Sequence, residues 1–304
     1  MTIPSTTFSP KTEMIPFWQK RKFRRAVSYS FRYLIALILI LFAVVPALWV
    51  VSASLNPAKS LASGTFFPKD PGFTNYTQLL QNEFFPYGKW LLNSLKIATI
   101  TSLLTVLITC LTGYALSRFK FEGRRTLMSA ILILNVFPSL LAIVALWAIM
   151  QQFGLYIPWL GLDTHGGLIM IYTAGAMGIN ALMVKSYIDA IPKELDESAM
   201  VEGASHWQIF QHIIFPMIIP MVITVGVLSF IAAYGDFVIA RIILKTADKL
   251  TVMVGIFLFR SDRFDQDFGV ITAGSVMAAI PIILMYIPLQ KYVISGLTAG
   301  SVKE

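Results

Sequence analysis

The sequence predicts an all-α integral membrane protein with six transmembrane helices, and three observations lead to this prediction. Of the 304 residues, 56% are hydrophobic and only 13% are charged, and the mean hydropathy is +0.71. Apolar runs long enough to cross a bilayer alternate with short polar stretches. The basic residues behind the net charge of +8 gather beside these runs, which indicates membrane topology and not nucleic-acid binding.

Each of the six predicted spans is an apolar run bounded by polar or basic residues. They cover residues 33–53, 90–116, 127–150, 168–184, 217–240 and 269–292. The first run is too long for the hydrophobic region of a signal peptide. A basic tail (1–30) precedes the transmembrane domain (31–292), and a short tail (293–304) follows it. With both termini cytoplasmic, most of the 24 Lys and Arg residues lie in cytoplasmic segments.

Several chemistries are excluded by what the sequence lacks. Cys110 is the single cysteine, so there is no disulfide framework. The sequence contains neither a phosphate-binding G-x-x-x-x-G-K-[ST] loop nor an H-E-x-x-H helix. His165, His206 and His212 are too dispersed to suggest a metal site. We therefore expect no enzyme and no metal or cofactor bound by this chain, and any energy that its function requires must come from a partner or an ion gradient.

Residues 188–216 contain the only extended polar helix pattern in the sequence and predict a helix, a glycine corner and a second helix. Pro192 suits the first helical position, and Gly203 suits a left-handed cap. Ser205 and Gln208 form a capping-box pattern, and the second helix is expected to end near Pro216. Either the loop lies flat on the membrane or it docks in a groove of another protein. Its acidic residues, which are Asp189, Glu194, Asp196, Glu197 and Glu202, favour a protein partner.

A second charged segment, residues 241–268, is predicted on the external side. Its Lys and Arg residues are nearly balanced by nearby Asp residues. It either docks an external partner or forms a solvated amphipathic helix on the membrane surface.

Polar and aromatic residues within or beside the spans are candidates for a solute path, because such groups are costly in lipid and tend to face a cavity or a protein interface. They are Asn135, Trp147, Tyr172, Asn180, Ser229, Tyr234 and Asp236. Each could equally serve helix packing. Asp236 either lies on a solute path or pairs with Arg241 at the membrane interface.

Residues of the 188–216 loop resemble the EAA loop of permease subunits of ATP-binding-cassette importers. Glu197, Ala199, Gly203, Ile213 and Pro216 stand at its spacing, whereas Ser198 and Phe215 replace the usual alanine and leucine. The resemblance implies a coupling helix that docks in a cleft of a cytoplasmic ATPase. The ATPase-coupling residues it implies are Glu197, Ala199, Glu202, Gly203, Ile213 and Pro216.

The resemblance extends over nearly the whole chain. Residues 66–76 and 90–96 are similar to sugar permeases, and residues 156–167 and 296–303 to the smaller permease of maltose and maltodextrin importers. It implies the type I ABC importer permease fold in the bacterial cytoplasmic membrane. It also implies three kinds of protein partner: a second permease, two ATPase copies and an extracytoplasmic sugar-binding protein. Segment 241–268 would probe the sugar cleft of that binding protein.

Two further implications concern the C-terminal tail and the mechanism. Gly300, Ser301, Val302 and Lys303 would reach the ATPase dimer. ATP and Mg would be bound by the ATPase, and sugar would move by alternating access. Maltodextrin is the expected substrate, with galacto-oligosaccharides and cyclodextrins as alternatives. A proton-coupled secondary transporter that uses Asp236 is the alternative from another class.

Overall fold

The computed structural model describes residues 21–57, 66–82, 85–136, 139–261 and 268–298. All regular elements in these ranges are helical, and none is a strand, which confirms the predicted all-α fold class. The chain divides into two units, residues 1–52 and 53–304.

Helix α1 (Arg21–Ser54) makes up the described part of the first unit. Its portion Ser28–Ser54 is apolar and long enough to cross a membrane. Large apolar side chains such as Phe31, Ile38 and Phe42 are exposed on several faces of this helix. Lipid is the solvent that such a surface requires.

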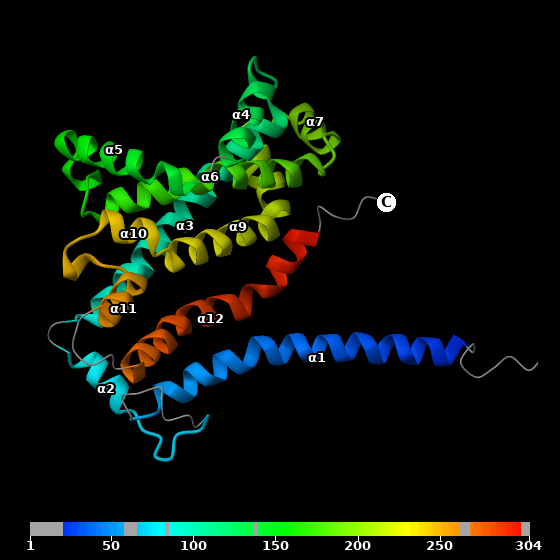
Figure 1. The fold of residues 1–304 in the computed structure, drawn as a ribbon. Helices are drawn as coiled ribbons and strands as arrows, with labels where there is room; N and C mark the ends of the chain where they lie inside the picture. Colours follow the sequence, from blue (N-terminus) through cyan, green and yellow to red (C-terminus); the bar gives the residue numbers. More distant parts are fainter. Residues whose placement is uncertain (1–20, 58–65, 83–84, 137–138, 262–267, 299–304) are drawn as a thin grey trace, which may run out of the picture. The chain divides into compact units, whose positions relative to one another are not determined.

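Four long helices form the frame of the second unit (Figure 1): α3 (Tyr87–Arg118), α6 (His165–Asp189), α9 (Phe215–Gly235) and α12 (Phe268–Thr298). α3 packs along both α6 and α9, and α12 packs along α9. Gly113 allows α3 to approach α6 closely, because a Cβ atom there would lie 2.7 Å from Val184 Cγ1. Short helix α2 (Thr74–Leu80) packs against α12.

The predicted third span (127–150) is not one continuous helix. It consists of α4 (Arg124–Val136), the 3₁₀ turn η3 (Ser139–Ala142) and α5 (Ile143–Tyr156). The sequence places Pro138 at the break, outside the described residues; a proline removes a backbone donor and crowds the preceding turn. Within the described ranges five helices are long and apolar enough to cross a membrane. The six-span topology therefore stays a prediction.

Segment 241–268, which is predicted to be external, packs against the helical core. It follows α9 through α10 (Val238–Ile243) and the 3₁₀ turn η6 (Ala247–Lys249) into α11 (Val252–Ser261). Leu244, Leu250 and Val254 are fully buried, and a Cβ atom at Gly255 would meet the Trp90 ring. The alternative of a solvated surface helix is therefore wrong for the described part of this segment. Residues 262–267 lie outside the described ranges.

Candidate functional site

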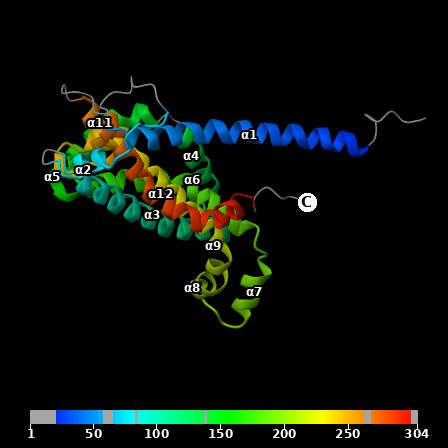
Figure 2. The same cartoon turned by 90° about the horizontal axis from the view of Figure 1, so that it is seen from below.

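The 188–216 loop has the predicted corner between two helices. Figure 2 shows α7 (Glu194–Val201) and α8 (His206–Ile209) together at the end of α6 and α9 that is far from α11. Gly203 adopts φ +90°, the left-handed region that favours glycine. Ser205 Oγ accepts from the Gln208 N–H at 3.3 Å, and Gln208 Oε1 accepts from the Ser205 N–H at 2.8 Å. The predicted left-handed cap and capping box are confirmed.

The predicted start of the first loop helix is wrong by two residues. α7 begins at Glu194, after Lys193 as its N-cap. Pro192 belongs instead to the turn that leaves α6, where buried Ile191 donates its N–H to the Ile188 carbonyl at 3.0 Å. The acidic first turn of α7, with Glu194, Asp196 and Glu197, still matches the helix dipole as expected.

The second loop helix does not end near Pro216, which corrects that prediction. α8 passes through a π-helical turn (Phe210–Ile214) directly into α9, and His206–Gly235 forms one continuous span. Pro216 follows the π turn directly, so its missing N–H removes one backbone hydrogen bond from this continuous helix. The wider π turn just before it accommodates the change of register. α8 and α9 are therefore parts of one helix.

A buried ion pair ties α7 to the end of α3. Arg118 Nε lies 2.5 Å from Asp196 Oδ2, and the two side chains are only 5% and 6% exposed. Arg118 also donates to the Ile191 carbonyl oxygen at 3.1 Å. One residue earlier, Ser117 Oγ donates to Asp189 Oδ1, whose carboxylate also pairs with Lys185. The last turn of α3 thus holds both α7 and the end of α6.

Aromatic side chains tie α8 to the same end of α3. The Tyr114 ring lies 5.1 Å from the Phe210 ring and 5.8 Å from the Phe119 ring, centroid to centroid. Phe119 also meets the His206 ring edge-on at 5.0 Å. Tyr114 completes the attachment by donating its hydroxyl to the His206 carbonyl oxygen at 3.2 Å. Both loop helices are therefore attached to α3.

Sequence reasoning missed this attachment. It treated Asp196 as one of several exposed acids on α7, whereas Asp196 is buried. Arg118 directly follows an apolar run, where an unpaired charge is costly. That position was the available signal that Arg118 needs an acidic partner.

The loop exposes both apolar and acidic side chains. Trp207 is 60% exposed and Val201 is 89% exposed, and Leu195 and Met200 are also exposed. Glu194, Glu197 and Glu202 of the same loop are exposed as well. We name these seven residues the docking face. A tryptophan beside aliphatic side chains, with charges at the margin, is the composition of a protein-binding hot spot.

The predicted coupling residues fall into two groups. Glu197, Glu202, Gly203 and Pro216 are exposed. Ala199 and Ile213 pack against the buried cluster that includes Val184, Ile209 and Ile214, so they shape the loop from within. The four predicted tail residues, Gly300 to Lys303, lie outside the described residues.

The predicted solute-path residues are only partly brought together. Tyr172 donates its hydroxyl to Asp236 Oδ1 at 2.7 Å, and Asn180 Nδ2 donates to Ser229 Oγ at 3.4 Å. Both contacts join α6 to α9 or its C-terminal end. Tyr234 instead donates to the Ala278 carbonyl of α12 at 2.9 Å.

Two other solute-path residues lie apart from these contacts. Asn135 bonds to the Ile131 carbonyl of its own helix and lies beside Gly178 of α6. Trp147 is half-buried on α5. A path lined by these residues stays a prediction.

Asp236 caps α10. Its Oδ1 atom accepts the N–H groups of Ile239 and Ala240, each at 3.0 Å, as well as the Tyr172 hydroxyl. Among the ion pairs of the described residues none joins Asp236 to Arg241. The alternative of an Asp236–Arg241 pair is therefore wrong, and the carboxylate has a structural role.

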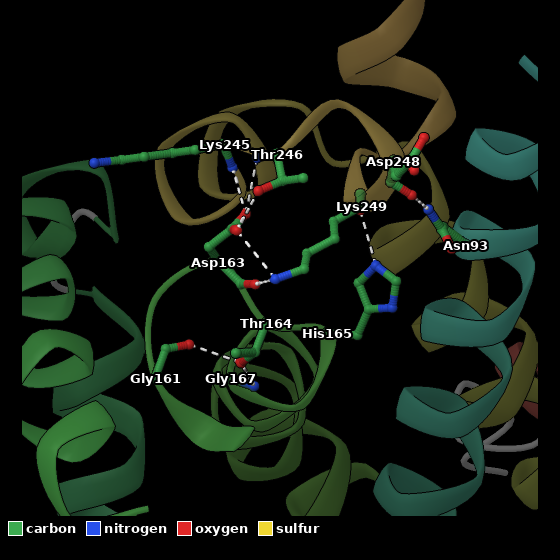
Figure 3. Close-up of polar contacts among 10 residues, drawn as sticks. All are labelled: Asn93, Gly161, Asp163, Thr164, His165, Gly167, Lys245, Thr246, Asp248 and Lys249. Carbon is green, nitrogen blue, oxygen red and sulfur yellow. Dashed lines mark hydrogen bonds and ion pairs between the residues drawn. The ribbon is translucent and has the colours of Figure 1, made fainter. Parts of the chain in front are cut away.

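At the opposite end of α6, Asp163 fixes the start of the external segment (Figure 3). Its carboxylate accepts the N–H groups of Lys245 and Thr246 and the Thr246 hydroxyl, at 2.6 to 3.0 Å. Lys249 Nζ lies 3.1 Å from Oδ2 and donates to the Asp163 carbonyl at 2.8 Å. His165 Nε2 lies 2.8 Å from the Lys249 carbonyl oxygen, and Asn93 donates to the Asp248 carbonyl at 2.8 Å. These contacts hold 245–249 against two membrane helices.

Asp163→Asn is expected to destabilise this attachment by about 2 kcal/mol, because it removes a charged acceptor of several hydrogen bonds. Burial raises the pKa of Asp163, but hydrogen bonds from Thr246, Lys245 and Lys249 outweigh burial and hold that pKa well below its usual value. The carboxylate is then stabilising above about pH 4, and its contribution declines as the pH falls below that value. Amide hydrogen exchange of residues 245–249, compared between wild type and variant from neutral pH to below pH 4, measures this. A difference that grows on acidification would contradict it.

Metal ligation finds no support in the described part of the chain. No group of three or more His, Cys, Asp or Glu residues there could hold a metal ion. The loop is attached to α3, continues into α9 and exposes the docking face.

Comparison with known proteins agrees with this arrangement. Residues 105–293 match the family model described as binding-protein-dependent transport system inner membrane component. The chain belongs to this family. It is therefore a membrane transport component.

Similar proteins cover nearly the full length of this permease. It is 37% identical over 283 residues to the galactooligosaccharides transport system permease protein GanQ of Bacillus subtilis (strain 168), covering 93% of this chain and 98% of the relative. It is 33% identical over 282 residues to the maltose/maltodextrin transport system permease protein MalG of Escherichia coli (strain K12), covering 89% and 94%. The expected relationship to sugar permeases of ABC importers is confirmed.

Solved structures confirm the permease fold. A chain from the crystal structure of a bacterial ABC transporter involved in the import of the acidic polysaccharide alginate has TM-score 0.75 at 21% identity, covering 91% of this chain and 99% of that chain. A chain from the alginate transporter in complex with an alginate pentasaccharide-bound periplasmic protein has TM-score 0.64 at 16% identity, covering 95% and 99%. At these identities the likeness concerns the fold.

Proposed function

We propose that this permease is the transmembrane subunit of an ATP-driven oligosaccharide importer, and that the 188–216 loop couples it to a separate ATPase. The observation that carries the proposal is the loop itself: it exposes apolar and acidic side chains, is attached at both of its helices to α3 and is continuous with α9. Such a face suits a groove on another protein. Its acids favour basic groups at the edge of that groove.

The proposed mechanism is alternating access. ATP binds with Mg to the ATPase subunits and closes them, and the docking face follows that closure. Because the loop is tied to α3, α6 and α9, its displacement changes the packing of these three helices together. A second permease completes the path, and an external binding protein delivers the sugar. Both termini would lie in the cytoplasm, as the basic tail before α1 favours.

The substrate class rests on the relatives. GanQ is named for galactooligosaccharides and MalG for maltose and maltodextrin. We therefore propose a short neutral oligosaccharide, with maltodextrins and galacto-oligosaccharides as the two classes to assay first. The chain belongs to a family of binding-protein-dependent transport components, and the Asp236 carboxylate caps α10. Both findings argue against the alternative of a proton-coupled transporter that uses Asp236.

Trp207→Ala is expected to weaken association with the ATPase at least thirtyfold, because truncation of a central hot-spot tryptophan costs 2 kcal/mol or more. Titration of labelled ATPase onto the permease complex in detergent measures this. Tyr156→Ala is the matched control, since Tyr156 is 83% exposed but lies on α5. Equal affinity of the Trp207 variant and wild type would contradict the docking role.

A further inference from the structure

A basic hollow lies beside the loop at the junction of α3 and α4. The hollow measures about 570 Å³ and is lined by both charged and apolar side chains. They are Lys120, Phe121, Gly123, Arg124, Arg125, Thr126 and Met128. None of these residues contributes to the docking face or to the solute path.

The cations of this hollow, Lys120, Arg124 and Arg125, outnumber the one acid beside them in the chain, Glu122. Arg124 and Arg125 occupy the first turn of α4, which contains no acidic residue. Cations there oppose the positive end of the helix dipole, and the first N–H groups of a helix lack acceptors within it. Arg124 Nε is buried without a hydrogen-bond partner. Asp189 is the acid within electrostatic reach of Arg124, but Lys185 and Ser117 already bind its carboxylate. An anion in the hollow would satisfy the dipole and these cations at once.

The surroundings of the hollow indicate which anion fits. Phe121 and Leu127 are exposed beside the cations, and further along α4 Leu132, Ile133 and Leu134 are exposed around the helix. Charged and apolar surfaces therefore adjoin along the helix. A free phosphate would use only the charged part, whereas a phospholipid would place its headgroup on the cations and its acyl chains along α4.

We propose that this hollow binds the phosphate headgroup of an anionic membrane lipid such as phosphatidylglycerol. The proposal rests on the proposed function in one respect, which is the placement of this end of α3 on the cytoplasmic side. A lipid bound here would lie beside Arg118 and the 188–216 loop. It would support the end of α3 to which the loop is attached.

Native mass spectrometry of the purified complex with added phosphatidylglycerol tests the site. Each cation removed is expected to weaken lipid binding about fivefold. Lys120→Gln should therefore weaken binding about fivefold. Replacing Lys120, Arg124 and Arg125 together by Gln should weaken it about a hundredfold. Lys291→Gln is the matched control, because Lys291 is an exposed lysine near the C-terminal end of α12. Unchanged binding in the triple variant, or equal weakening by Lys291→Gln, would overturn the proposal.

Two measurements on the unmutated complex complete the test. Phosphatidylglycerol is expected to bind at least tenfold more tightly than phosphatidylcholine, and an equal affinity for the two lipids would overturn the proposal. Inorganic phosphate is expected not to displace the lipid at millimolar concentration; displacement would assign the hollow to a free anion instead. Lipid binding can be measured whether or not an ATPase is bound. Failure of the lipid proposal is therefore distinguishable from failure of the coupling proposal.

Discussion

Arg118→Ala is expected to abolish ATP-driven sugar uptake while the chain still inserts in the membrane. The substitution leaves Asp196 buried without its ion partner, and breaking a buried pair from one side costs 3–5 kcal/mol. That cost falls on the attachment of α7 to α3 and not on the apolar packing of the long helices. Uptake of radiolabelled oligosaccharide into cells, compared with the amount of permease in the membrane, measures the effect.

Two control variants separate loss of attachment from general destabilisation. Arg118→Met combined with Asp196→Leu replaces the pair by apolar side chains, which buried sites often tolerate, and is expected to recover a substantial part of uptake. Lys89→Ala removes one partner of an ion pair whose side chains are 61% and 60% exposed, and is expected to change uptake little. Normal uptake in Arg118→Ala would show that the buried pair does not transmit movement.

Gly203→Val is expected to reduce uptake at least tenfold without loss of the permease from the membrane. Gly203 has φ +90°, and a β-branched residue is a strained outlier there. A Cβ atom would meet nothing within 4 Å, so the expected damage is a change of backbone course and not a clash. α8 would then leave the position in which Ser205 caps it and Trp207 belongs to the docking face. ATP hydrolysis stimulated by binding protein should fall together with uptake.

The choice of replacement sharpens this test. Gly203→Asn is expected to keep most of the activity, because asparagine tolerates the left-handed region better than other residues with side chains. Gly88→Val is the matched control, since a Cβ atom at Gly88 also meets nothing within 4 Å and its φ is not positive. Equal activity of Gly203→Val and Gly203→Asn would mean that the left-handed corner is not what the loop requires.

The parts of the site that could be predicted from the sequence are the local ones. Gly203, Ser205 and Gln208 act through backbone contacts a few residues apart, so their spacing is sufficient. The Arg118–Asp196 pair could not be predicted in this way, because its partners are distant in sequence and meet only when α3, α6 and α7 pack. Pro216 was misinterpreted for a related reason: the rule that proline ends a helix does not anticipate the preceding π turn.

The membrane helices show the same contrast between features set by the local sequence and features set by distant contacts. Hydropathy predicted the long helices well, because their composition alone makes lipid the favoured solvent. It did not predict the division of the third span into α4, η3 and α5. Hydropathy also gave no signal that 245–249 is held by Asp163 and His165, since those hydrogen bonds join loops far apart in the chain.

Purification of the tagged permease from its native membrane in a gentle detergent, with quantification of every co-purifying protein, tests the coupling role most directly. The expected result is a second permease and two ATPase copies for each tagged chain, with the ATPase lost from the Trp207→Ala variant. Recovery of the permease alone or as a homodimer that still moves sugar without ATP would contradict that role.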